Sequence, residues 1–203
     1  MNFFERNRRE TAAKGYDPSR LPPGQYRTED FPVLHVGPVP EYAPGEWDMT
    51  ITGLVNNEIR ITWDQLISMP AIEMTVDIHC VTKWSQFDMK WKGARVSDVL
   101  TMAGLKPSAT HVMAHAEYGY TANLPLSDAT TPEAIIAYEY EGAPIEPIHG
   151  GPVRLVIPHL YFWKSPKWLR GIELMDHDAP GFWERNGYHM YGDPFKEQRH
   201  WGD

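Results

Sequence analysis

Short apolar segments with the composition of β-strands follow one another through most of this 203-residue chain, and turn residues separate them. The expected strands cover residues 46–53, 71–80, 111–117, 120–124, 134–140, 153–157 and 168–175. Glycine and proline interrupt these runs, as in Glu141-Gly142 and Gly151-Pro152. So many strands with so few helices predict an α+β fold, mixed and mostly β with short helices, rather than a series of βαβ units.

Two segments carry the signals of short helices. Thr62-Trp-Asp-Gln65 has the spacing of a capping box, and the helix that it opens should end before Pro70. In the second segment, the apolar residues between Val96 and Met102 recur at helical spacing. Gly104 follows them as a plausible C-terminal stop.

Residues 1–32 have no clear hydrophobic period and are rich in arginine, proline and glycine. Such a segment is expected to form an extended N-terminal arm. Residues 33–203 are then expected to form one compact domain. Because 42% of the chain is hydrophobic and 12% is aromatic, it can bury a substantial core.

Charge and hydropathy argue against several classes of partner. A formal net charge of −8 disfavours nucleic acid, which needs clustered Lys and Arg on a basic domain. No apolar run approaches the roughly 18 residues of a membrane span. The Arg8-Arg9 pair resembles a twin-arginine export signal, but no apolar segment follows it, so a cytoplasmic location is expected.

Cys80 is the only cysteine of the chain, and it ends the expected strand 71–80 directly before the polar turn 81–84. A single thiol forms no intramolecular disulfide. Its sulfur is therefore either a small buried apolar group or a group with a chemical function.

Two later segments carry cations that need anionic partners. Arg154 lies inside the apolar strand 153–157, where burial of its charge is costly unless an anion accompanies it. Lys164-Ser165-Pro166-Lys167 supplies two cations and a hydroxyl on an expected loop. Such donors near glycine are the ones that hold phosphate. For Arg154, an ion pair with a carboxylate of the chain is the alternative.

Six segments in order along the chain resemble a known family. They are Cys80-Val-Thr-Lys-Trp84, Trp91-Lys-Gly93 with Val96-Ser-Asp-Val-Leu100, Gly119-Tyr-Thr-Ala-Asn-Leu-Pro125, His149-Gly-Gly-Pro-Val-Arg154, Trp163-Lys-Ser-Pro-Lys167 and Gly181-Phe-Trp-Glu-Arg-Asn-Gly-Tyr-His189. Together they resemble the oxidoreductase molybdopterin-binding domain of the sulfite oxidase family, in its small, haem-free bacterial branch. The resemblance covers about residues 33–195. The Cys-Val-x-x-Trp segment is similar to the catalytic subunit of bacterial methionine sulfoxide reductase.

The resemblance implies a role for each candidate site residue. Cys80 is expected to bind molybdenum directly, as the thiolate ligand of a Mo-molybdopterin cofactor. The other expected cofactor contacts are His35, Pro38, Val39, His115, His149, Arg154, Ser165, Pro166 and Lys167. The phosphate of the cofactor would then be the counter-charge of Arg154.

Structural alternatives accompany these assignments. Cys80 could be an inert buried thiol, since free cysteine is among the most buried residue types. The three candidate histidines could be hydrogen-bonded core or turn residues. His79, His111 and His115 could be imagined as a zinc set, but no HExxH or paired CxxC spacing supports one. The aromatic segment 182–191 is interpreted as packing and cover.

By the same resemblance, the protein is expected to be a molybdopterin-dependent oxidoreductase that performs two-electron oxygen-atom transfer on a small substrate, such as an S- or N-oxide. Leu34 stands where sulfite oxidases carry a substrate-binding Arg, which disfavours sulfite. Sulfite oxidation with Lys83 as the replacement cation, a non-catalytic molybdopterin carrier and a cofactor-free binding module are the alternatives. The chain has no CxxCH haem motif, so we expect no haem and a separate electron donor or acceptor.

Overall fold

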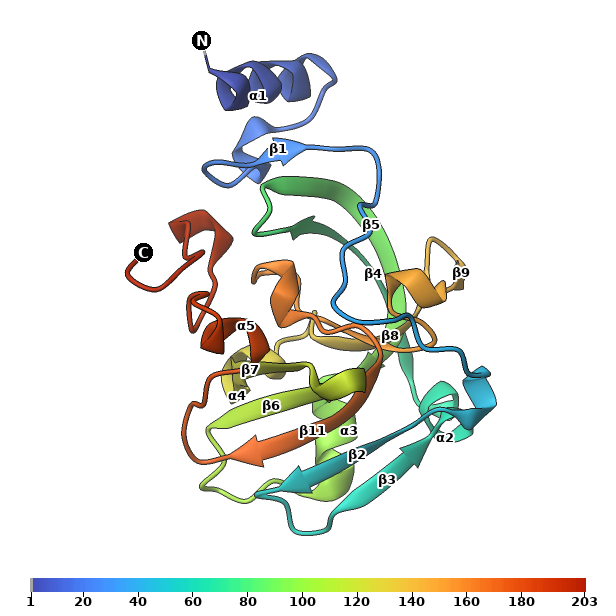
Figure 1. The fold of residues 1–203 in the computed structure, drawn as a ribbon. Coiled ribbons are helices and arrows are strands. Elements are labelled where there is room, and N and C mark those ends of the chain that lie inside the picture. Colours follow the sequence, from blue (N-terminus) through green and yellow to red (C-terminus); the bar gives the residue numbers. More distant parts are fainter. Residues whose placement is uncertain (1) are drawn as a thin grey trace.

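Two β-sheets form the framework of the protein, and a computed structural model describes residues 2–203, with the side chain of Pro44 left out (Figure 1). The first sheet contains β1 (Tyr26–Arg27), β4 (Ala71–His79), β5 (Trp84–Arg95), β8 (Ile135–Tyr140), β9 (Ala143–Pro144) and β10 (Arg154–Val156). Its order is β1-β5-β8-β10, with β4 paired to β5 and β9 paired to β8. The second sheet contains β2 (Asp48–Gly53), β3 (Ile59–Thr62), β6 (His111–Ala116), β7 (Thr121–Pro125) and β11 (Leu169–Met175), in the order β3-β2-β11-β6-β7.

Short helices connect the strands. The α-helices are α1 (Phe3–Ala13), α2 (Trp63–Ser68), α3 (Val96–Ala103), α4 (Leu126–Ala129) and α5 (Phe182–Arg185). The 3₁₀ helices are η1 (Pro18–Arg20), η2 (Pro44–Glu46), η3 (Glu117–Gly119), η4 (Pro147–His149), η5 (Phe162–Lys164) and η6 (Pro194–Lys196). Within residues 2–203, no helix combines the length and apolar character that crossing a membrane requires. The predicted class, mixed and mostly β with short helices, is confirmed.

The sequence signals for α2 and α3 act as predicted. The Thr62 side chain accepts a hydrogen bond from the Gln65 backbone N–H, and the Gln65 side chain accepts one from the backbone of Thr62. This reciprocal pair is the capping box. Helix α3 ends at Gly104, whose φ of 69° lies in the left-handed region that glycine enters without a steric penalty.

Strand β5 is absent from the sequence-based prediction. Core-facing residues such as Met89 and Trp91 alternate with exposed Asp88 and Lys90, which is the period of a strand with one solvated face. Because polar and charged residues occupy one face of β5, its sequence contains no continuous apolar run that would indicate a strand. Strands β4 and β5 pair antiparallel, and the turn between them carries Cys80.

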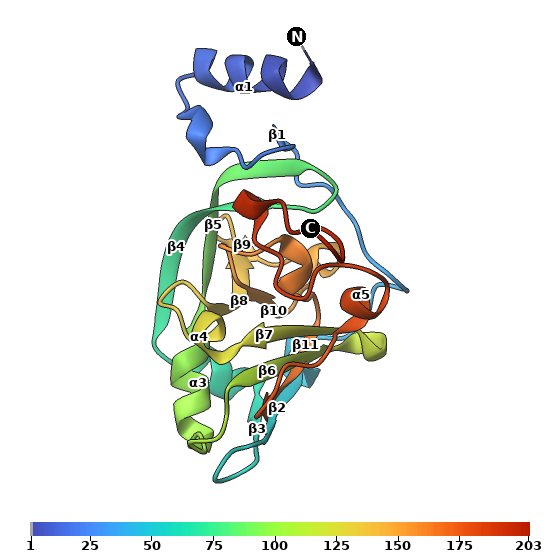
Figure 2. The same cartoon turned by 90° about the vertical axis from the view of Figure 1, so that its left-hand side faces the viewer.

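The N-terminal arm is not extended throughout, contrary to the expectation from the sequence. Helix α1 begins with a capping box in which the Asn2 side chain accepts from the backbone N–H of Glu5. Strand β1 then pairs in parallel with the start of β5. Figures 1 and 2 show α1 and β1 lying over one end of the β4–β5 hairpin. From residue 28 to residue 43 the chain has no regular structure.

Two clusters of buried apolar side chains form the core. The larger cluster joins the two sheets, because Val99 and Leu100 of α3 share it with Ile136 of β8 and Ile172 of β11. The smaller cluster contains Cys80 together with side chains of β4, β5, β8 and β10. The only cysteine therefore lies where the β4–β5 turn meets a hydrophobic core.

Candidate active site

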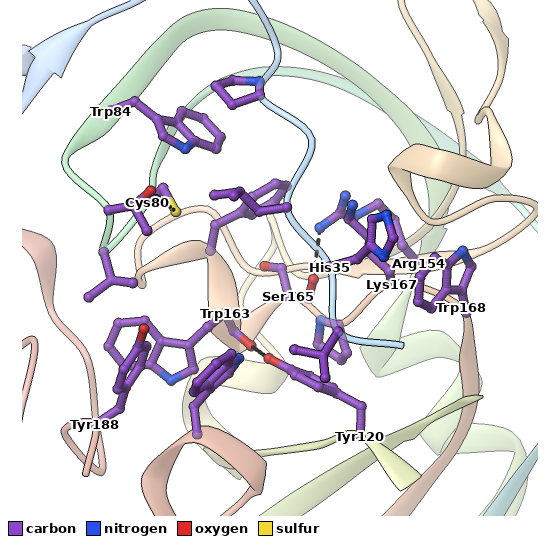
Figure 3. Close-up of a pocket in the computed structure, with 18 of the residues that line it drawn as sticks. His35, Cys80, Trp84, Tyr120, Arg154, Trp163, Ser165, Lys167, Trp168 and Tyr188 are labelled. Carbon is purple, nitrogen blue, oxygen red and sulfur yellow. Dashed lines mark hydrogen bonds between the residues drawn. The ribbon is translucent and has the colours of Figure 1, made fainter. Parts of the chain in front are cut away.

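A cavity of about 360 Å³ lies beside the β4–β5 turn (Figure 3). The predicted site residues that line it are His35, Cys80, Arg154, Ser165, Pro166 and Lys167. Most of the remaining wall is aromatic, from Phe31, Trp84, Tyr120, Phe162, Trp163, Trp168, Trp183 and Tyr188. Figure 3 shows a cationic end, with Arg154 and Lys167, and a thiol end, with Cys80 and Tyr188.

A tight turn places Cys80 at the edge of the cavity. The Lys83 N–H donates to the Cys80 carbonyl at 2.9 Å, and the Cys80 N–H donates to the Trp84 carbonyl at 2.9 Å. Lys83 has a φ of 81°, the left-handed conformation that closes many three-residue hairpin loops. These two bonds fix both the N–H and the carbonyl of Cys80, at the residue where the turn begins.

The Cys80 thiol is buried next to a hydroxyl donor. The residue is 9% exposed, and Thr82 Oγ1 donates to Sγ at 3.1 Å. Burial raises the pKa of the thiol above its usual value, and the Thr82 hydrogen bond only partly opposes this effect. Without a metal the sulfur is therefore a protonated thiol, whereas a bound cation would deprotonate it. These properties suit a metal ligand better than a free nucleophile.

Arg154 is a buried cation without an ionic partner. It is 1% exposed and donates from Nη1 to the His149 carbonyl at 2.7 Å and from Nη2 to the Ser165 carbonyl at 2.8 Å. Among residues 2–203, nothing accepts from its Nε and no carboxylate pairs with it. Burial lowers the pKa of Arg154 to about 9. The ion pair considered as an alternative is therefore not found in the described chain.

Lys167 adds a second positive charge beside Arg154. Its Nζ donates to the Ile148 carbonyl at 2.7 Å. Burial, and then the charge of Arg154, lowers the pKa of Lys167 to about 7. Gly150 permits Lys167 to approach the backbone at residue 150 closely. It has a φ of +105°, and a Cβ there would lie 2.8 Å from Cβ of Lys167. Burial disfavours the charged form of both residues, and the charge of Arg154 further disfavours that of Lys167. Two such neighbouring cations form an arrangement that binds an anion.

The loop between β10 and β11 completes the cationic end. Ser165 Oγ accepts from the Ile157 N–H at 2.9 Å, which leaves the hydroxyl proton available for another acceptor. The Pro166 carbonyl accepts from the Leu155 N–H at 3.0 Å. These bonds tie the loop to β10, so that Ser165 and Arg154 are held side by side.

Lys164 does not contribute its charge to the cavity, although the sequence analysis counted it among the phosphate-binding cations. Its Nζ lies 2.6 Å from Glu184 Oε1 and donates to Asn123 Oδ1 at 2.7 Å. The Trp163 indole donates to the same Glu184 oxygen at 2.7 Å. The buried ion pair with Glu184 corrects that interpretation of Lys164.

Two of the three histidines predicted as cofactor contacts lie close to the cationic end. His35 lines the cavity, and its Nδ1 is 3.0 Å from the Gly37 carbonyl. The ring of His149 stacks on Phe31 at a centroid distance of 4.1 Å, behind the cavity wall. In the described part of the chain, His149 Nδ1 is buried without a hydrogen-bond partner. Pterin contact by these residues stays a prediction.

The structure does not bring Pro38, Val39 or His115 to the cavity wall. The lining segment before β2 ends at Val36. His115 Nε2 lies 3.0 Å from Glu173 Oε2, across the β6–β11 pair, so its position agrees with the hydrogen-bonded alternative. From residue 2 onward, no group of three or more His, Cys, Asp or Glu residues is arranged to hold a metal ion, and this includes the imagined zinc set.

Sequence analysis missed the aromatic wall at the thiol end. Trp183 and Tyr188 belong to the segment interpreted as packing and cover, yet both line the cavity. Their rings stack at a centroid distance of 4.8 Å with 18° between planes. Tyr120 donates its hydroxyl to the Trp163 carbonyl at 2.8 Å. The available signal was the density of aromatic residues after position 160, but spacing alone does not say which of them face a cavity.

Comparison with known proteins decides the family. Residues 36–183 match the family model described as oxidoreductase molybdopterin binding domain. The chain belongs to this family. The resemblance predicted from the sequence is thereby confirmed, and the protein is a molybdopterin oxidoreductase.

Several relatives support this membership. The uncharacterized oxidoreductase YuiH of Bacillus subtilis (strain 168) is 49% identical over 181 residues, or 89% of this chain and 91% of that protein. The protein-methionine-sulfoxide reductase catalytic subunit MsrP of Gluconobacter oxydans (strain 621H) is 31% identical, with 74% of this chain and 54% of that protein covered. Mitochondrial sulfite oxidase of Drosophila melanogaster is 29% identical, with 79% and 32% covered. This chain thus spans about half of MsrP and about a third of that sulfite oxidase.

A solved structure supports the fold. The sulfane dehydrogenase SoxCD from Paracoccus pantotrophus matches with a TM-score of 0.66 and 21% identity, over 81% of this chain and 46% of that one. The match confirms that the predicted sulfite-oxidase-type fold is correct.

The lowered pKa of Lys167 predicts how the cofactor-free protein responds to pH. Its pKa is about 7 in the folded protein against an ordinary value of 10.5, so the unfolded chain binds more protons between these values. The contribution of Lys167 to stability should therefore rise as pH increases from about 7 toward 10. The measurement is the melting temperature of cofactor-free wild type and Lys167→Met across this range.

We expect Lys167→Met to be the more stable protein at the lower end of the range, and the advantage should shrink as pH rises. Lys106→Met, which alters an exposed lysine, is the matched control and should follow wild type. Parallel pH profiles for Lys167→Met and wild type would contradict the prediction.

Proposed function

We propose that the cavity binds a Mo-molybdopterin cofactor and that the enzyme transfers an oxygen atom to or from a small substrate, such as an S- or N-oxide. One observation carries the proposal: the Cys80 thiol, the buried cation Arg154 and the partly buried cation Lys167 face the same cavity without a protein anion among residues 2–203. Thiolates suit soft, covalent metal sites, and such cations suit phosphate. Membership of the family supports the same cofactor.

The donors of the cationic end fit a phosphate-bearing pterin. Arg154 Nε has no acceptor within residues 2–203, and the Ser165 hydroxyl retains a proton to donate. His149 Nδ1 is a further unpaired polar atom close by. The cavity volume of about 360 Å³ falls within the roughly 300–1,000 Å³ of small-molecule sites.

The bound cofactor would supply a molybdenum centre that cycles between its VI and IV states and exchanges an electron pair with the substrate. Cys80 would hold the metal, while Arg154, Ser165 and Lys167 would fix the phosphate. Reduction of an oxide takes up two electrons and two protons and releases the deoxygenated product and water. A separate donor would provide the electrons.

At the thiol end, the aromatic walls would exclude bulk water from the reacting atoms. Tyr188 directs its side chain into this end. Burial raises the pKa of Tyr188, so its hydroxyl keeps its proton at neutral pH and can donate a hydrogen bond to a substrate oxygen.

The distribution of charge favours an uncharged substrate over sulfite. The Lys and Arg side chains in the described lining are Arg154 and Lys167, both at the cationic end. Lys83, considered above as a replacement for the missing Arg, has its Nζ 5.5 Å from the ring centroid of Phe4 and does not line the cavity. An anion at the thiol end would therefore have no Lys or Arg side chain of the described chain in direct contact with it, and Arg199 and Lys167 would act on it only from a distance.

Cofactor content tests the proposal. Wild type produced in a molybdate-supplied host that makes the cofactor should contain near-stoichiometric molybdenum and pterin. Cys80→Ser should lose molybdenum or show an altered metal spectrum, because the thiolate ligand is gone, while the donors of the cationic end still retain pterin. Elemental analysis and pterin fluorescence after denaturation measure both quantities.

Thr82→Val is the matched control for Cys80→Ser. It removes the hydroxyl that donates to the Cys80 sulfur but leaves the sulfur in place, so molybdenum should be retained. Wild type that contains neither molybdenum nor pterin would refute the proposed function. Pterin without reducible molybdenum would favour the alternative of a non-catalytic carrier.

The charge distribution also predicts substrate preference. With a reduced viologen as electron donor, kcat/KM for dimethyl sulfoxide or trimethylamine N-oxide should exceed, by at least about tenfold, kcat/KM for sulfite oxidation measured with ferricyanide as electron acceptor. The reason is that no Lys or Arg side chain from residues 2–203 lines the thiol end. Lys83→Gln should leave these values within about twofold, as its ammonium lies outside the cavity. Faster turnover of sulfite, with a strong loss in Lys83→Gln, would support the sulfite oxidase alternative instead.

A further inference from the structure

Trp84 carries a buried N–H group for which the protein supplies no acceptor. The residue is 3% exposed and lines the cavity. Nothing in the described chain accepts a hydrogen bond from its Nε1. Leaving a buried donor unpaired is costly, and because Trp84 lines the cavity, a ligand bound there is one source of the missing acceptor.

Three of the neighbouring donors are already engaged, whereas the Tyr188 hydroxyl described above is a second donor at the thiol end. Trp163 and Trp168 each donate their indole N–H to a protein oxygen at 2.7 Å, and the Tyr120 hydroxyl donates to a carbonyl at 2.8 Å. Trp91 also has an unpaired N–H, but it does not line this cavity. Within residues 2–203, Trp84 is thus the cavity-lining indole that is both buried and without an acceptor.

The indole of Trp84 is held firmly beside Cys80. The Cys80 N–H donates to the Trp84 carbonyl at 2.9 Å. Phe31 and Phe162 pack edge to face against the indole, at centroid distances of 6.2 and 6.1 Å. Figure 3 shows the indole nitrogen of Trp84 on the side of the ring that faces Cys80. The donor is therefore pre-organised next to the expected metal ligand.

Resting on the proposed function, we propose that the Trp84 N–H donates a hydrogen bond to the oxygen atom of the bound oxide and so acts as a catalytic residue. The oxygen of a sulfoxide or N-oxide carries a partial negative charge and is a strong acceptor, which a neutral indole N–H can serve without a cation. The deoxygenated product has lost this oxygen, and the sulfur of a thioether is only a weak acceptor. The same hydrogen bond therefore distinguishes substrate from product.

The indole N–H signals of the holoprotein test this bond. The chain has eight tryptophans, and nitrogen-15-labelled tryptophan gives one indole cross-peak for each. The peak lost in Trp84→Phe assigns Trp84. Dimethyl sulfone is then added to anaerobically reduced holoprotein. Its oxygen atoms accept hydrogen bonds, and it is expected not to be reduced. We expect the Trp84 N–H proton to move downfield and the Trp91 proton, buried and unpaired outside the cavity, to stay in place.

Turnover provides the second test. With molybdenum and pterin content equal to wild type, kcat/KM for dimethyl sulfoxide should fall about three- to tenfold in Trp84→Phe, as expected for one lost hydrogen bond. Since phenylalanine also leaves unfilled space, Trp84 is further replaced by β-(3-benzothienyl)alanine, which keeps the shape and lacks the N–H. The same fall is expected. Trp201→Phe, which alters a tryptophan that is 65% exposed and outside the cavity, is the control.

Unchanged kcat/KM in the isosteric variant at full cofactor loading would overturn the role of Trp84 and leave the proposed function intact. A Trp84 signal that is already downfield in the holoprotein and does not respond to the sulfone would also overturn it, because the N–H would then serve the cofactor. Absence of molybdenum and pterin from wild type would overturn both proposals.

Discussion

The buried positive charge of Arg154 is the constraint on which the rest of the site depends. The guanidinium is 1% exposed and satisfied by two carbonyls, but no carboxylate of the described chain neutralises it. Lys167 then adds a second charge beside it rather than relieving it. A fold that buries Arg154 and sets the partly buried Lys167 beside it is incomplete without an anion, because omitting the partner of a buried charge costs several kcal/mol. In the proposed function, the phosphate of a pterin cofactor would meet this need.

The two ends of the cavity are built by different means and serve different chemistry. At the cationic end, β10 and the loop that follows it present Arg154 and Ser165 through backbone hydrogen bonds. At the thiol end, a hairpin turn closed by Lys83 in a left-handed conformation presents Cys80. Aromatic side chains line the space between them. In the proposed function, cofactor anchoring and substrate chemistry would thus occupy different ends of the cavity, and the cations that would hold the phosphate lie at the end away from Cys80.

The sequence predicts those features that local pattern or charge alone determines. The capping box at Thr62 follows from the chain itself, and the structure agrees. For Arg154 the sequence left a carboxylate of the chain as an alternative partner, and no carboxylate among residues 2–203 pairs with it. Features set by contacts between distant segments were missed. Lys164 could not be separated from Lys167 without knowing that Glu184 lies against it. Nothing in the spacing indicates that the indole N–H of Trp84 lacks an acceptor, since that depends on how the β4–β5 turn meets the aromatic wall.

The most direct test of the central claim is a crystal structure of the protein purified from a host that makes the cofactor. We predict electron density for a phosphate group within hydrogen-bonding distance of Arg154 Nε, continuous with a pterin that reaches the sulfur of Cys80. Density for ordered water alone at Arg154 in a protein that contains molybdenum would contradict the account, as would a carboxylate of the chain in that place. The buried charge would then be neutralised by other means.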